Sequence, residues 1–167
     1  MKLKTFLLSV ILIFVRLSAV AQAEEKILNI DYGGSVYFSF NSLPKYTNGI
    51  TYTDYTQLSV KYTDTTDTGA TDGNGWMLTV KPAAAITGSS ENLAYNVLKL
   101  VVTYNSTTTE YLMDGSEITI AEGNAEDPPT SKHLILIGFE TGTDNSVEGY
   151  TPDYYYVDLV FWLKKRP

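Results

Sequence analysis

The feature that most constrains the fold of this sequence is an alternation of apolar and polar residues, interrupted at short intervals by turn residues. In residues 36–40, for example, Val36, Phe38 and Phe40 fall on one face of an extended segment. A period of two is typical of half-buried β-strands, and closely spaced turns are typical of antiparallel connections. Similar segments occur at residues 27–30, 36–40, 58–62, 76–81, 97–104, 110–113, 117–121, 133–139 and 154–163. The sequence therefore predicts an all-β fold, an antiparallel β-sandwich of about nine strands, with a barrel as the alternative.

The composition agrees with strands, because the chain is rich in threonine and holds 13 tyrosines. We expect no sustained helix, although residues 90–97 can hold one helical turn, and we expect residues 41–49 to be a loop. The core is predicted to contain the inward-facing apolar residues Val36, Phe38, Phe40, Leu58, Val60, Leu78, Val80, Leu98, Leu100, Ile135, Ile137, Leu159 and Phe161.

The N-terminus differs from the rest of the chain. A basic start precedes an apolar run at residues 6–15, and the sequence Ala-Gln-Ala follows at residues 21–23. These three features describe a cleavable secretory signal peptide. A membrane anchor is the alternative, but it needs about 20 apolar residues, and Arg16 interrupts the run. We expect a signal peptide at residues 1–23, a single domain at residues 24–167, and a protein that is secreted, at the bacterial cell surface or extracellular, without membrane insertion after cleavage.

The charge of the chain and its scarcity of reactive side chains exclude several classes of function. The net charge of −7 disfavours nucleic acids and anionic membranes as partners. The chain has no cysteine, which excludes disulfides and thiolate metal sites, and His133 is its single histidine. No motif pairs a nucleophile with a base, and no glycine-rich phosphate loop occurs. We therefore expect a non-catalytic protein that needs no cofactor.

One acidic stretch is a weak candidate for a calcium site. Asp64, Asp67 and Asp72, with Asn74, offer oxygen ligands of the kind that Ca²⁺ prefers. Their spacing does not fit the twelve-residue calcium loop of EF-hands. The alternative is a solvated, turn-rich connection between two strands.

Two aromatic motifs resemble those of the WxL domain, a bacterial cell-surface module. Trp76 and Leu78 form the first W-x-L, directly after a glycine. In the second motif, near the C-terminus, Tyr155 and Leu163 fall at the family's positions, and Phe161 stands where the family has tryptophan. The resemblance implies non-covalent adhesion to the cell wall, by binding peptidoglycan or a partner surface protein. The same residues also fit a sandwich core, so the sequence leaves open whether they pack or bind.

A second set of rings is a candidate binding platform. If Tyr155 and Leu163 face inward, Tyr154, Tyr156 and Trp162 face outward, because successive side chains of a strand point to opposite faces. Exposed aromatic rings on a strand face suit the apolar C–H faces of sugars. The alternatives are a sheet buried on both sides and an interface with another subunit.

Two functions therefore remain. The first is a WxL-like surface module that binds cell-wall glycan or another surface protein. The second is a fimbrial or extracellular-matrix subunit that assembles by strand addition. Residues 24–26 are short and charged, and residues 164–166 are basic, which is typical of solvated ends on a closed domain and favours the first.

Overall fold

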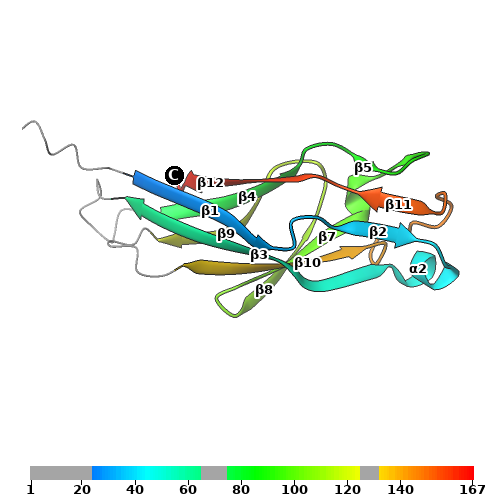
Figure 1. Cartoon of the computed structure of the whole chain (residues 1–167), viewed down its shortest axis with the longest axis horizontal. Coiled ribbons are helices and arrows are strands. Elements are labelled where there is room, and N and C mark those ends of the chain that lie inside the picture. The colour runs from blue at the N-terminus through cyan, green and yellow to red at the C-terminus, as the bar shows by residue number, and fades with distance from the viewer. Residues whose placement is uncertain (1–23, 65–74, 125–131) are drawn as a thin grey trace, which may run out of the picture.

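The computed structural model describes residues 24–64, 75–124 and 132–167, which form an antiparallel β-sandwich (Figure 1). These residues hold twelve strands, and every strand pairing among them is antiparallel. One layer is a five-stranded sheet in the order β1 (Glu24–Tyr32), β3 (Ile50–Asp64), β10 (His133–Thr141), β7 (Leu98–Tyr104) and β8 (Thr107–Leu112). The sandwich that the alternation predicts is thus confirmed. The signal peptide predicted at residues 1–23 lies outside the described residues.

The second layer consists of two shorter sheets. One has the order β2 (Tyr37–Phe40), β11 (Asp153–Tyr156), β5 (Ile86–Thr87) and β6 (Asn92–Leu93). The other has the order β12 (Leu159–Lys165), β4 (Gly75–Pro82) and β9 (Ile118–Asn124). The two sheets lie end to end, because β11 runs into β12 and β4 runs towards β5 (Figure 1). The backbone N–H of Ala83 joins them by donating to the carbonyl of Asp158 at 2.8 Å.

The described residues hold three strands more than expected, because the last expected strand is divided in two and the two-residue strands β5 and β6 lie between expected strands. Residues 154–163, expected as one strand, are interrupted at residues 157–158. On the neighbouring strand, Pro82 ends β4, since a proline has no N–H to continue a ladder. Each break separates the part of the strand in the four-stranded sheet from the part in the three-stranded sheet.

The expectation of a loop at residues 41–49 is wrong. Helix α2 (Leu43–Asn48) lies there, with Ser42 as its extended N-cap. Pro44 stands in the first turn, where the missing N–H of proline costs no hydrogen bond. A turn of 3-10 helix, η1 (Tyr95–Val97), falls in the stretch expected to hold one helical turn.

The first two strands belong to different layers, and Gly33 makes the crossing possible. β1 pairs with β3, whereas β2 pairs with β11. Gly33 has a φ of 71°, and a Cβ atom there would lie 2.0 Å from the carbonyl oxygen of Tyr55. A larger residue would push the chain away from β3, so only glycine fits this close approach. The crossing leaves β1 at one edge of the five-stranded sheet.

The core lies between the two layers and contains most of the expected residues. The expected residues that are buried are Val36, Phe38, Phe40, Leu58, Val60, Leu78, Val80, Leu98, Leu100, Ile135 and Ile137. The expectation that Leu159 and Phe161 are core residues is wrong, because both are only half-buried and pack against the margin of the core. In the described part of the fold β12 is an edge strand, so no described strand lies beside these two side chains on one side.

Candidate ligand-binding face

Three tyrosines gather on the outer face of the four-stranded sheet. Tyr154 and Tyr156 alternate along β11 with the buried Tyr155, and their exposed fractions are 66% and 44%. Tyr37 of β2 is 59% exposed and lies directly across from Tyr156. Directly opposed residues of an antiparallel pair share a face, so the three rings lie on one face of the sheet. We call Tyr37, Tyr154 and Tyr156 the tyrosine face.

The strand beneath the tyrosine face is held firmly. The hydroxyl of the buried Tyr155 donates to the backbone carbonyl of Thr151 at 2.8 Å, and its ring meets Phe40 edge-on at 6.1 Å. Burial raises the pKa of Tyr155 to about 12. The hydroxyl of Ser89 donates to Asp153 at 2.6 Å, and this bond is the main cause that lowers the pKa of Asp153. The exposed rings therefore project from a backbone fixed on its inner side.

Trp162, the third residue of the expected platform, lies apart from Tyr154 and Tyr156. It belongs to β12 in the three-stranded sheet, six residues beyond Tyr156, which is about 20 Å along an extended chain. Its side chain is 38% exposed, and the Nζ atom of Lys164 lies 5.6 Å from its ring centre. Lys164 also forms an ion pair with Glu117. The structure therefore replaces the expected row of three rings with the tyrosine face and a separate tryptophan.

Tyr37 is the member of the tyrosine face that the sequence reasoning missed. Alternation already places it opposite Phe38 and Phe40, which was the available signal. Alternation does not predict which strand pairs with β2, because its partner lies more than 100 residues further along the chain.

The two W-x-L-like stretches lie side by side, since β4 pairs with β12 and Leu78 lies across from Leu163. Trp76, Leu78 and Tyr155 are completely buried, and Leu163 is half-buried. In this structure the first three side chains pack in the core and offer no surface to a ligand. Their positions favour the packing interpretation of the motifs over the binding one.

Trp76 is enclosed by residues of three other strands. Its ring centre lies 5.7 Å from that of Tyr104 and 5.1 Å from that of His133. Gly123 of β9 covers its indole edge, where a Cβ atom would lie 2.5 Å from the Nε1 atom. The glycine therefore provides the space that the indole occupies.

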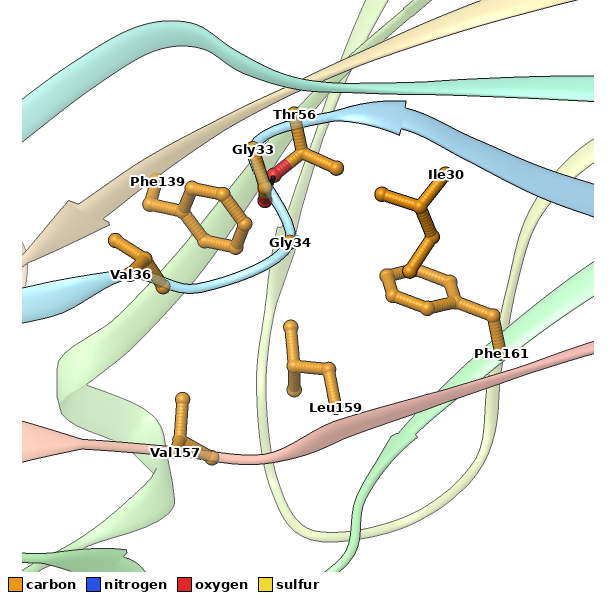
Figure 2. A pocket seen from close by; sticks show the side chains of 9 residues that line it. All are labelled: Ile30, Gly33, Gly34, Val36, Thr56, Phe139, Val157, Leu159 and Phe161. Atoms are coloured by element: carbon orange, nitrogen blue, oxygen red, sulfur yellow. Dashed lines mark hydrogen bonds between the residues drawn. The ribbon is translucent and has the colours of Figure 1, made fainter.

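A small apolar pocket opens where β1 and β12 face each other across the sandwich (Figure 2). Its volume is about 60 Å³, enough for one aliphatic side chain. Ile30 and Phe161 line one end, and Leu159 and Val157 line the side formed by the C-terminal segment. The pocket lies beside Phe161, whose ring is half-buried on the edge strand β12.

His133 lies beside a more polar hollow of about 360 Å³. Its Nδ1 atom is 3.0 Å from the hydroxyl oxygen of Tyr104. The other described residues that line the hollow are Asn105, Glu122, Gly123, Asn124 and Arg166. Among these lining residues, no serine or aspartate stands beside the histidine.

Asp64 is the one candidate calcium ligand among the described residues. Asp67, Asp72 and Asn74 lie outside the described residues, and Asp64 ends β3. Across residues 24–64, 75–124 and 132–167, no group of three or more His, Cys, Asp or Glu side chains is arranged to hold a metal ion.

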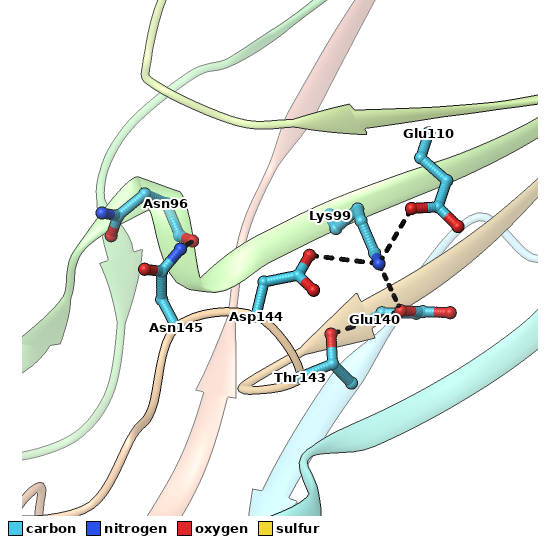
Figure 3. A network of polar contacts seen from close by, with 7 residues as sticks. All are labelled: Asn96, Lys99, Glu110, Glu140, Thr143, Asp144 and Asn145. Carbon is cyan, nitrogen blue, oxygen red and sulfur yellow. Dashed lines mark hydrogen bonds and ion pairs between the residues drawn. The ribbon is translucent and has the colours of Figure 1, made fainter.

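A cationic side chain on the outer face of the five-stranded sheet joins three acids (Figure 3). The Nζ atom of Lys99 lies 2.9 Å from Glu140, 3.1 Å from Glu110 and 3.1 Å from Asp144. The bond to Glu140 is the main cause that raises the pKa of Lys99, so the lysine is held charged. The cluster ties β7, β8 and β10 together, which is a structural role.

The sequence matches no protein-family model and no curated protein. Within the part of the chain that the structure describes, no helix has the length and apolar character needed to cross a membrane.

Proposed function

We propose that this chain is a non-catalytic, secreted module of the bacterial cell surface that binds cell-wall glycan through the tyrosine face. The observation that carries the proposal is the exposure of Tyr37, Tyr154 and Tyr156 on one face of a rigid sheet. Rings with both an apolar face and a polar hydroxyl suit sugars, which also combine C–H faces with hydroxyl groups. Exposed aromatic clusters on a protein surface commonly mark such interaction sites.

The spacing of the rings fits an extended, repetitive ligand. Tyr154 and Tyr156 are two residues apart on one strand, about 7 Å, and Tyr37 adds a ring beside Tyr156. The acidic character of the chain agrees with an uncharged or basic ligand surface. Wall glycan meets these requirements, and a partner surface protein is the other outcome that the experiment distinguishes.

The test is retention on purified peptidoglycan sacculi, measured by co-sedimentation over a range of protein concentrations. Each stacked ring contributes about 1 kcal/mol, so Tyr156→Ala and Tyr37→Ala should each weaken retention roughly fivefold. Tyr32→Ala is the matched control, because Tyr32 is equally exposed but lies on β1 in the other layer. Equal retention of all three variants would contradict the proposal.

Two further measurements separate the outcomes. Retention that survives protease treatment of the sacculi indicates glycan, and retention that disappears indicates a partner protein. Mass spectrometry of the exported protein should give a chain that begins at residue 24. An intact N-terminus in the exported protein would contradict the signal peptide.

Assembly by strand addition is the second candidate function. The observation in its favour is that, among the described strands, β12 pairs with β4 alone. Against a strand-exchange subunit, both β1 and β12 pair within their own domain over seven or more residues. Negative-stain microscopy of the purified protein decides between the two, because filaments would favour the subunit.

A further inference from the structure

Among the strands that the structure describes, β12 forms an open edge of the three-stranded sheet. β11 is flanked on both sides, by β2 and β5. β12 continues the same line but, among the strands in residues 24–64, 75–124 and 132–167, it has a neighbour on one side only. Within the part of the chain that the structure describes, the first strand of this layer begins at Tyr37, so the crossing after β1 leaves the place beside β12 without a strand. A strand that continued β2 in the direction of β12 would occupy this edge.

The hydrogen-bond pattern shows which backbone groups face the open edge. Arg166 donates its N–H to the carbonyl of Gly75, and Asp158 accepts from Ala83, so residues 158 and 166 point towards β4. Backbone groups alternate in direction along an antiparallel strand. Leu159, Phe161 and Leu163 therefore direct their N–H and C=O groups to the open edge. No proline or bulge interrupts the strand between residues 159 and 165.

The surroundings of this edge are apolar and exposed. Ile30 is 54% exposed on β1, and Val160 and Trp162 are exposed on the outer face of β12. The apolar pocket between β1 and β12 opens beside Leu159 and Phe161 (Figure 2). Soluble proteins usually protect an edge strand with charges, a bulge or a covering segment. An open and apolar edge is the feature by which a strand from another chain is recognised.

The sequence of β12 is complementary to itself in one register. We propose that two copies of this chain pair β12 with β12 in antiparallel orientation, with the two-fold axis at Phe161. On the inner face, Leu159 of each copy then lies across from Leu163 of the other. On the outer face, Val160 lies across from Trp162, and Asp158 lies across from Lys164. Each of these three pairs occurs twice, as a two-fold interface requires, and the two copies of Phe161 lie across from each other on the axis.

The register with its axis at Trp162 loses this complementarity. With the two-fold axis at Trp162, Leu159 of one copy would lie across from Lys165 of the other, and Val160 across from Lys164. Moving the axis by one residue shifts the register by two and alters every cross-strand pair, so an axis at Phe161 is favoured over one at Trp162. The paired β12 strands join the two three-stranded sheets into one sheet, and the outer faces of both copies lie on the same side.

The absence of cysteine allows a test of the register by disulfide formation. Val160→Cys and Trp162→Cys are prepared as separate variants, both at exposed positions. When mixed under mild oxidation, they should form a mixed disulfide dimer, since an opposed pair without ladder hydrogen bonds has Cα atoms about 4.5 Å apart. Each variant alone should cross-link poorly, because diagonal neighbours are about 7–8 Å apart, beyond disulfide reach.

Sedimentation velocity of the otherwise unmodified chain measures the association itself. We expect a monomer–dimer equilibrium, and Val160→Glu should raise its dissociation constant at least tenfold. Leu134→Glu is the control, because Leu134 is also exposed but lies on the outer face of the five-stranded sheet. Circular dichroism should show that both variants remain folded.

Three results would overturn the proposal. The first is a monomer at all concentrations up to about 1 mM. The second is a dimer that Val160→Glu and Leu134→Glu weaken equally. The third is a mixture of the two cysteine variants that cross-links no better than either variant alone. If Val160→Glu fails to fold, the cysteine experiment still decides.

Discussion

Leu78 lies directly across from Leu163, and this pair brings the two W-x-L-like stretches of the chain together on neighbouring strands. Leu78 is fully buried, and Leu163 packs against the same core from the edge strand. The two stretches are about 80 residues apart in the sequence and form one packing unit in the fold. Residues that resemble a binding motif thus contribute to the stability of the three-stranded sheet.

The two tryptophans should differ in stability and in fluorescence. Trp76→Ala should lower the free energy of unfolding by about 3–5 kcal/mol, because it removes a completely buried indole. Trp162→Ala should lower it by less than about 1 kcal/mol, because Trp162 is exposed. Urea denaturation measures both. In Trp162→Phe, the remaining emission of Trp76 should resist quenching by iodide, and strong quenching would contradict its burial.

Phe161→Ala should destabilise the domain only moderately. The ring is half-buried beside the apolar pocket, so we expect a loss of about 1–2 kcal/mol instead of the 3–5 kcal/mol typical of a fully buried phenylalanine. Phe38→Ala is the control, because Phe38 is fully buried, and it should lower the free energy of unfolding by the full value of about 3–5 kcal/mol. Equal losses in urea denaturation would mean that Phe161 belongs to the core.

Removal of the central cation should expose the repulsion between the acids around it. Lys99→Met leaves Glu110, Glu140 and Asp144 together without a counter-charge, and two of these acids are partly solvated. We therefore expect a loss of about 1–2 kcal/mol in low salt, reduced by added salt. Lys81→Met, at an exposed lysine, is the control and should have little effect. A loss that does not depend on salt would contradict the electrostatic explanation.

Tyr155 should make the domain sensitive to alkali. Because burial raises the pKa of Tyr155 to about 12, the folded state keeps a proton that the unfolded chain releases near pH 10. Its contribution to stability is complete below pH 10 and is lost as the pH rises to 12. Tyr155→Phe should cost about 1 kcal/mol at neutral pH, through the lost bond to Thr151, and should lose less stability than the parent between pH 10 and 12.

The last strand shows which features the alternation of apolar and polar residues predicts and which it does not. Alternation correctly predicts that Tyr155 faces inward and that Tyr154, Tyr156 and Trp162 face outward. It does not predict the break at residues 157–158, which divides these outward rings between two sheets. The break depends on which strands lie alongside, namely β2 and β5 on one part and β4 on the other.

The sequence by itself determines the strand periods, most turns and the identity of most inward-facing residues, because these follow from the alternation of neighbouring side chains along the backbone. The tertiary structure alone decides which strands become neighbours, since pairing depends on contacts between distant segments. Tyr37 joins Tyr156 only because β2 meets β11, and Phe161 remains half-buried only because β12 is left at an edge. Both the candidate binding face and the open edge therefore arise from strand order.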